Sequence, residues 1–494
     1  MSDFLAGAGL LIAAGAGATA ILLPAGRPRA VAMAAAMVLF PVLILGDQWH
    51  TAQIVDLRHD EWRIVALLAV ATVVIGALAY AFRCRPVLLP LAIVFALPFR
   101  IPLHAGGDTA NLLVPLYLVI AAGVATTAIR VWPRSPAGPV AAGAARWLPR
   151  VLAVVVVLYA VQALYSADFS KGLQNVCFFL VPFTVAFALL QDVKWDGRLL
   201  RWVLIVVGIE ASAFVLVGSV EFVTRNLFWN DQIIRSNEFH TYFRVNSVFW
   251  DPNIYGRYLA LVTVVATAAM LWERTRDRFW LLCALILVLW IGLVPTFSQS
   301  SFIALLAGLA MLAAIRWSRR WTLAAVVVGL VGGVLVVLLV GGSGKVTPDR
   351  LNVDLSGRGS LISGGLDLFA ERPLQGYGSG SFQAAYREHR QNKDAPVTIS
   401  HTEPVTVAAE QGLIGLVAYI ALIVVALWTL GRGLWTAPPA PPAGITARAA
   451  VLAAFVALLV HTLAYAGFFE DPITWVLLAV GTSLATAPAV RNPT

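Results

Sequence analysis

The sequence predicts an all-α, polytopic transmembrane helical bundle, and three observations support this fold class. Of 494 residues, 60% are hydrophobic and only 12% are charged. Soluble domains carry roughly 25% charged residues, about twice the charged fraction of this chain. The mean hydropathy is +0.82. The apolar residues form long continuous runs rather than alternating segments of about ten residues, which favours helices over a membrane β-barrel. A water-soluble enzyme and a disordered chain are both excluded.

A helix that crosses a bilayer needs about 20 mostly apolar residues. The chain has fifteen candidate runs, and the shortest, above all 87–99 with Pro90 and Pro98, are also compatible with re-entrant segments. We therefore predict about 12 to 15 spans. The candidate runs are 4–23, 30–46, 64–82, 87–99, 111–129, 151–165, 174–190, 202–222, 254–272, 279–296, 300–315, 321–340, 404–430, 450–466 and 473–488.

The distribution of lysine and arginine predicts the orientation of these spans, because short cytoplasmic loops are enriched in both residues. If the first inter-span loop is cytoplasmic, twenty basic residues fall inside and seven fall in the opposite short loops. The inside set is Arg27, Arg29, Arg83, Arg85, Arg130, Arg134, Arg146, Arg150, Lys194, Arg198, Arg201, Arg274, Arg276, Arg278, Arg316, Arg319, Arg320, Arg432, Arg448 and Arg491. The outside set is Arg58, Arg63, Arg100, Lys171, Arg225, Arg235 and Arg244.

The net charge of +9 is therefore mainly a record of topology. No loop concentrates basic residues beside exposed aromatics, so we predict no nucleic-acid partner. The three cysteines have no spaced partner, and neither a disulfide framework nor a metal site is implied.

Two long outer loops, at about 223–253 and 341–403, interrupt the short connectors. Such loops frequently carry function. The first ends in Arg244 and a segment Asp251-Pro252-Asn253, which is a helix-start signal, and Arg257 follows in the next span. A hydroxyl-rich turn, Ser298-Gln299-Ser300, lies two spans later. The second loop contains Arg358 and a glycine run from Gly376 to Gly380, and it closes at His401, with Glu410 in the span that follows.

These residues predict a site at one membrane face. Arginine suits a diphosphate, because its planar fork gives two charge-assisted hydrogen bonds to phosphate oxygens. Histidine accepts a proton near neutral pH, as activation of an attacking hydroxyl requires. The combination is equipped to displace a lipid diphosphate from a sugar.

The motifs resemble those of the O-antigen ligase and polymerase family of bacterial membrane glycosyltransferases. The matching patterns are Arg-x-x-Ser-x-Phe-x-x-Pro-Asn-x-x-Gly from Arg244, Ser-x-Ser at Ser298, Arg-Pro-Leu-x-Gly-x-Gly-x-Gly-x-Phe from Arg372, and His401 before Glu-x-Gly-Leu-Ile-Gly at Glu410. The resemblance covers roughly residues 240 to 430. This chain has Gln299 and Thr402 where the family usually has arginine and asparagine.

The resemblance implies an inverting, metal-independent transfer from a polyprenyl-diphosphate-linked glycan, without a cofactor, at the extracytoplasmic side of the bacterial inner membrane. Arg244 and Arg358 would hold the diphosphate, and His401 would activate or orient the acceptor hydroxyl. The acceptor stays open between a second lipid-linked glycan, a cell-wall polysaccharide, a lipid and a protein side chain. The predicted catalytic set is His401, Arg244, Arg358 and Glu410, and the predicted substrate-binding set is Arg257, Asn253, Ser298, Gln299, Ser300, Arg372 and Tyr377.

Two other functions are compatible with the sequence. Asp56, Asp60 and Glu61 lie in the first outer loop, where acidic residues would serve a metal-dependent enzyme that uses polyprenyl-phosphate sugars. Glu210 lies within an apolar span, as in a transporter of lipid-linked glycans.

The resulting domain prediction has three parts. An N-terminal transmembrane bundle would cover residues 1–222, and an O-antigen-ligase-like catalytic core, with both long loops, would cover 223–430. C-terminal transmembrane segments would cover 431–494.

Overall fold

The computed structural model describes residues 3–105, 108–131, 146–239, 242–323, 326, 358–391, 400–435 and 443–486. Its helices are α1 (Asp3–Leu22), α2 (Arg27–Asp47), α3 (Ala52–His59), α4 (Glu61–Cys84), α5 (Leu88–Ala96), α6 (Val114–Val131), α7 (Trp147–Ala163), α8 (Phe169–Asn175), the π-helix η2 (Val176–Leu180), α9 (Val181–Leu190), α10 (Gly197–Thr224), α11 (Asp231–Phe239), α12 (Pro252–Leu271), α13 (Arg276–Leu293), the 3₁₀-helix η3 (Val294–Thr296), α14 (Gln299–Arg316), α17 (Arg358–Glu371), α18 (Phe382–His389), α19 (Glu403–Gly431), α20 (Ala443–Thr462) and α21 (Pro472–Thr486). Two strands, β1 (Ile101–Ala105) and β2 (Asp108–Leu112), pair as an antiparallel hairpin.

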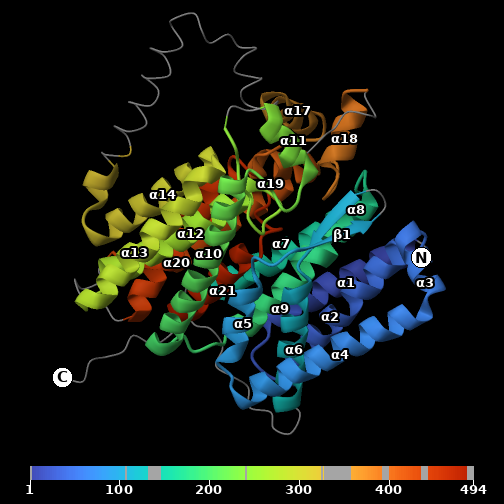
Figure 1. Cartoon of the computed structure of the whole chain (residues 1–494). Helices are drawn as coiled ribbons and strands as arrows, with labels where there is room; N and C mark the ends of the chain where they lie inside the picture. The colour runs from blue at the N-terminus through green and yellow to red at the C-terminus, as the bar shows by residue number, and fades with distance from the viewer. Residues whose placement is uncertain are drawn as a thin grey trace, which may run out of the picture.

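The predicted polytopic helical bundle is confirmed, and the hairpin is a small addition to it (Figure 1). Within the part of the chain that the structure describes, eleven helical segments are long and apolar enough to cross a bilayer. Three further predicted spans are shorter helices, α5, α7 and α21. The predicted span 321–340 lies almost entirely outside the described residues.

The helices pack as two groups around one continuous apolar core. In the first group, α1 contacts α2, α7 and α9, and α6 contacts α2 and α4. In the second, α12 contacts α13, α14 and α20, and α13 contacts α10. The last helices join the groups, because α19 packs on α7 and α21 packs on α9. The contact between α20 and α12 crosses the predicted boundary at residue 431, and the three-part domain division stays a prediction.

Short polar side chains fix where the long helices begin. The carboxylate of Asp251 accepts a hydrogen bond from the N–H of Asn253 at 2.6 Å, with Pro252 as the first residue of α12. The predicted helix start at Asp-Pro-Asn is therefore confirmed. Asp196 caps α10 in the same way through the N–H groups of Arg198 and Leu199. At the start of α12, Pro252 has no N–H that could remain unpaired, and Asp251 accepts the N–H of the residue that follows the proline.

One end of the bundle gathers the starts of α12, α14, α19 and α21 and the ends of α10, α13 and α20. The short helices α11, α17 and α18 lie beyond this end, at the top of Figure 1. Because the two long predicted outer loops contribute these short helices, we call this end of the molecule the loop end.

Candidate functional site

The segment that carries Arg244 is held by hydrogen bonds to its backbone and its side chain. The side-chain amide of Asn237, on α11, accepts from the N–H of Arg244 and donates to its carbonyl, both at 3.0 Å. The guanidinium donates from Nε to the carbonyl of Thr296 at 2.9 Å and from Nη2 to Oδ1 of Asn253 at 3.1 Å. These bonds direct the guanidinium toward the starts of α12 and α14.

The buried carboxylate of Glu221 holds the backbone of the segment that carries Arg244. Glu221, near the end of α10, accepts hydrogen bonds from the N–H groups of Ser247 at 2.7 Å and Asn246 at 3.2 Å. Ser247 has a left-handed backbone, with φ of +53°. Such a conformation persists in a residue other than glycine only where its surroundings hold it, and Glu221 provides that support.

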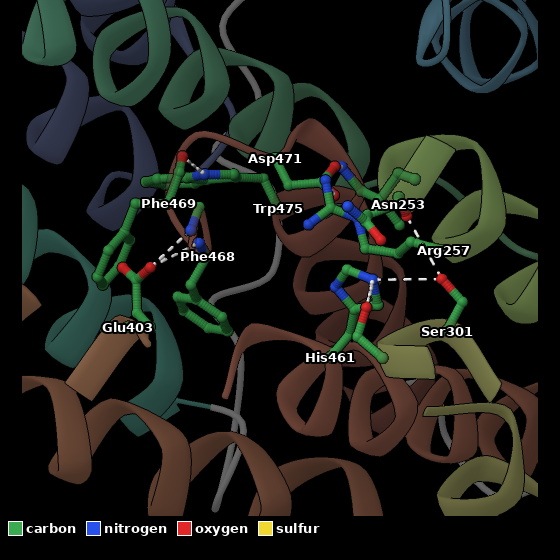
Figure 2. A network of polar contacts seen from close by, with 12 residues as sticks. Asn253, Arg257, Ser301, Glu403, His461, Phe468, Phe469, Asp471 and Trp475 are labelled. Carbon is green, nitrogen blue, oxygen red and sulfur yellow. Dashed lines mark hydrogen bonds and ion pairs between the residues drawn. The ribbon is translucent and has the colours of Figure 1, made fainter. Parts of the chain in front are cut away.

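The serine turn, Ser298 to Ser301, begins α14. The hydroxyl of Ser298 lies 3.2 Å from that of Ser300 and 2.8 Å from that of Ser301. His461, at the end of α20, is fully buried, and its Nε2 lies 3.2 Å from the Ser300 hydroxyl and 3.4 Å from that of Ser301. The hydroxyl of Ser301 also donates to the carbonyl of Asn253 at 3.4 Å. Figure 2 shows the hydroxyl of Ser301 joined by dashed lines to both His461 and Asn253.

Gln299, within this turn, and Phe297, just before it, are exposed. Phe297 has a φ of +48°, and its ring packs on that of Tyr242 with 4.9 Å between centroids. Gln299 is therefore the predicted binding residue of the turn whose side chain faces outward.

Arg257 and Asp471 form a buried ion pair next to the serine turn. Nη2 of Arg257 lies 2.9 Å from Oδ2 of Asp471, and both side chains are about 95% buried. The second carboxylate oxygen of Asp471 accepts from the N–H of Ile473 at 2.8 Å and caps α21. Among the residues that the structure describes, Nη1 of Arg257 has no hydrogen-bond partner. The pair ties α12 to the start of α21 (Figure 2).

Tyr465 lies between two histidines. Its ring centroid is 6.4 Å from that of His401 and 5.8 Å from that of His461. The guanidinium carbon of Arg257 lies 6.0 Å from the same ring. Burial raises the pKa of the Tyr465 phenol well above its usual range, so this hydroxyl stays protonated. His401 has a φ of +62° and precedes α19. The neighbouring Thr402 donates to the carbonyl of Leu463 at 3.0 Å.

The predicted residues Glu410, Arg372 and Tyr377 belong to a second cluster at the loop end. Both oxygens of the buried Glu410 carboxylate accept backbone N–H bonds, from Gly380 at 2.8 Å and Phe382 at 3.1 Å. Arg372 stacks 4.2 Å from the ring centroid of Tyr377. Tyr377 donates to Glu371, and this hydrogen bond lowers the pKa of Glu371. The carboxylate of Glu410 therefore fixes the glycine run.

Helix α17 begins at Arg358, whose side chain lies outside the described set. The structure thus brings together Arg244, Asn253, Arg257, Ser298 and Ser300, with His401 joined to them through Tyr465. We call these residues, together with Ser301, His461, Tyr465 and Asp471, the outer cluster.

The sequence prediction lacked His461, Tyr465, Asp471 and Glu221. Asp471 precedes Pro472 and carries the same helix-start signal as Asp251. Glu221 and His461 are polar residues in apolar runs, a pattern that indicates a buried or functional group. Tyr465 has no distinguishing signal in the sequence.

Of the residues that the two alternative functions would use, Asp60 and Glu210 have local partners. The carboxylate of Asp60 accepts from the N–H of Arg63 at 3.3 Å and lies 2.8 Å from its guanidinium. Glu61, next to it, begins α4 and is exposed. Glu210 is buried and accepts a hydrogen bond from the hydroxyl of Tyr258 at 2.7 Å.

A hollow of about 500 Å³ lies next to Phe243, the residue that precedes Arg244. Its lining consists of Arg225, Asn226 and Leu227, which follow α10, of Ile234, Asn237 and Glu238 on α11, and of Tyr242 and Phe243. Because Asn237 holds the backbone of Arg244 and Tyr242 packs on Phe297, the hollow adjoins both the arginine segment and the serine turn.

Comparison with known proteins gives one family. Residues 283–420 match the family model described as O-antigen ligase. The match begins within α13 and covers the serine turn, the glycine run, His401 and Glu410. Arg244 lies before the matched range and His461 lies after it. No curated protein matches the chain.

Proposed function

We propose a reaction for this chain on the premise that it is a multi-pass membrane protein of the O-antigen ligase family, a family of membrane glycan ligases and polymerases that use lipid-linked donors. The chain transfers a glycan from a polyprenyl-diphosphate carrier to an acceptor hydroxyl at the extracytoplasmic face. The transfer inverts the anomeric carbon and requires no metal. The observation that carries this proposal is the convergence of Arg244, the serine turn and Asn253 at one end of the bundle.

In this reaction the acceptor oxygen bonds to the anomeric carbon of the glycan while the bond from that carbon to the diphosphate oxygen breaks. Negative charge therefore grows on the diphosphate as it leaves. Arg244 stabilises that charge through its planar donors, because Asn253 and Thr296 already fix its orientation. Arg358 supplies the second cation.

His401 accepts the proton of the acceptor hydroxyl. The ring of Tyr465, whose phenol is protonated, packs near the rings of both His401 and His461. The hollow next to Phe243 accommodates the first sugar of the donor. Its volume lies within the range of about 300–1,000 Å³ that is typical of ligand pockets.

A reconstituted transfer assay tests the proposal. Membranes from the source strain lacking this gene provide donor and acceptor, and purified protein is added in vesicles. We expect Arg244→Ala to abolish both the release of polyprenyl diphosphate and the joining of glycan to acceptor. Arg244→Lys should recover little, because a lysine cannot reproduce the two-donor fork. Arg235→Ala removes a charge from the same outer loop and should leave transfer unchanged.

The role of His401 has a separate signature. His401→Gln keeps a polar side chain but cannot take up a proton, so we expect kcat to fall by about 10²–10⁴-fold. Binding of the donor should persist, and normal turnover by this variant would contradict the assignment.

Two measurements separate the proposal from its alternatives. Chelation with EDTA should leave transfer unchanged. A loss that Mg²⁺ restores, together with inactivity of Asp60→Asn and Glu61→Gln, would instead support the metal-dependent enzyme. Movement of a lipid-linked glycan across the vesicle membrane without glycan transfer would support the transporter, provided that Glu210→Gln abolishes this movement.

The configuration of the new glycosidic bond, determined by NMR, tests inversion directly.

A further inference from the structure

A second cavity, of about 640 Å³, has one end at the side of the bundle opposite to the outer cluster. There it is bounded by the first residues of α10 and α20 and by the last turns of α12, and its other end reaches Tyr258 and Ile473, next to Arg257 and Asp471 of the outer cluster. Its lining runs along α12 from Trp272 to Tyr258. Those fourteen steps correspond to about 20 Å at the helical rise of about 1.5 Å per residue.

The walls of this cavity are apolar. Leu261, Val265 and Ala269 of α12 face Ala450 and Ala454 of α20 across it. The helices that supply these residues are long and apolar enough to cross a bilayer. Hydrocarbon is the medium that surrounds such helices, so a lipid chain is the occupant that these walls fit.

The mouth of the cavity is basic. Arg201, Arg274 and Arg278 line it together with Trp195 and Trp272. Glu273 is the single carboxylate among the described lining residues. Its oxygen Oε1 already accepts the N–H groups of Arg274 and Thr275, both at 2.9 Å. This end of the cavity therefore carries three exposed arginines and one carboxylate that already accepts backbone hydrogen bonds.

We propose that this cavity binds one anionic phospholipid. The headgroup phosphate contacts Arg201, Arg274 and Arg278, and one acyl chain lies along α12 between the apolar walls. Basic pockets between membrane helices bind anionic headgroups in this way, and tryptophans at the same level suit the membrane interface. The diphosphate of the donor belongs to the opposite end of the bundle, and a neutral lipid lacks the net charge that the three arginines complement.

Native mass spectrometry of the purified full chain tests the proposal. The protein in detergent is mixed with phosphatidylglycerol or with phosphatidylcholine of the same acyl composition. We expect a one-to-one adduct with phosphatidylglycerol that survives gentle activation and weak, non-saturating adducts with phosphatidylcholine. The triple variant R201A/R274A/R278A should bind phosphatidylglycerol about 100-fold more weakly, because each arginine contributes to the attraction of an anionic headgroup.

A matched control keeps the result specific to the cavity. R198A/R276A/R320A removes three exposed arginines from the same predicted face without changing the lining, and it should bind as the unmodified chain does. A second pair of variants tests the apolar slot. Ala269→Trp fills the slot and should block the adduct, whereas Thr267→Trp, at a half-buried position two residues away and outside the lining, should not.

Equal binding of both phospholipids, or full binding by the triple variant, would overturn the proposal. Displacement of the adduct by undecaprenyl phosphate at equal concentration would also overturn it, because the slot would then serve the carrier lipid. None of these outcomes depends on glycan transfer, so this proposal and the proposed function fail separately.

Discussion

The ion pair between Arg257 and Asp471 is buried, which sets what the loss of either partner costs. Removing one partner of a buried pair leaves the other charge without compensation, which costs about 3–5 kcal/mol. Nη1 of Arg257 has no partner among the described residues, so Asp471 is the charge that compensates this guanidinium there.

We predict that Arg257→Ala lowers the free energy of unfolding by about 3–5 kcal/mol. The double variant R257M/D471L should recover most of this loss, because neither charge remains buried alone. Chemical denaturation in detergent measures both values. Arg63→Ala, which breaks an exposed pair with Asp60, should cost only about 0–1 kcal/mol. If the double variant is stable and still transfers glycan, Arg257 has no role in donor binding.

Glu221 provides a second test at the scale of single residues. Its carboxylate oxygens accept N–H groups of Asn246, Ser247 and Phe228. An amide offers one accepting oxygen instead of two, so Glu221→Gln should cost about 1–3 kcal/mol. We expect the rate of transfer to fall together with stability, because the Arg244 segment loses its support. Glu388→Gln, at an exposed position on α18 and outside the lining of the hollow, is the control and should change neither quantity.

The residues of the outer cluster differ in how well the sequence predicts them. Arg244 and Asn253 lie nine positions apart in one motif, and their contact follows from a short segment entering a capped helix. His461 meets Ser300 across 161 positions. That contact depends on how α20 packs against α14, which a single sequence does not specify.

At the scale of elements, the glycine run is a rigid part of the fold. Gly376, Gly378 and Gly380 all have positive φ values. A Cβ on Gly378 would lie 2.2 Å from the Cα of Ser166. The run therefore needs glycine twice over, for its backbone conformation and for its close approach to the α7–α8 connection.

We predict that Gly378→Ala destabilises the protein far more than Gly433→Ala. Gly433 has a φ of +76°, but a Cβ there meets nothing within 4 Å. Its replacement should cost only the backbone strain of about 1–2 kcal/mol. Thermal unfolding in detergent compares the two variants. Equal losses would mean that the contact with Ser166 relaxes freely.

The elements themselves follow from hydropathy where they are long. Eleven predicted spans are helices of membrane-crossing length, because a run of about 20 apolar residues has few other stable arrangements in lipid. The short segments are harder to predict. The run 87–99 forms only the nine-residue helix α5, and the hairpin of β1 and β2 follows it. The helix ends before Pro98, because proline interrupts a helical pattern.

At the scale of the whole molecule, the distribution of basic residues predicts which end faces the cytoplasm. Cys84 is exposed in a predicted cytoplasmic loop, and Gln299 is exposed in the serine turn. We expect a membrane-impermeant maleimide to label Gln299→Cys in intact cells and to label Cys84 only after permeabilisation. Cys177 is buried and serves as an unreactive reference within the same chain. The reverse labelling pattern would invert the topology.

Finally, α19 is interrupted at Gly412, where φ is +63° and ψ is −160°. The N–H groups of Leu413 and Ile414 donate instead to the carbonyls of Pro373 and Leu374, at 2.7 and 3.3 Å. In lipid, an interrupted helix survives only where protein satisfies its freed backbone groups. The interrupted helix is therefore compatible with the membrane only when the 373–374 segment has docked against it. Insertion of α19 and folding of the outer loop that precedes it are coupled steps for this reason.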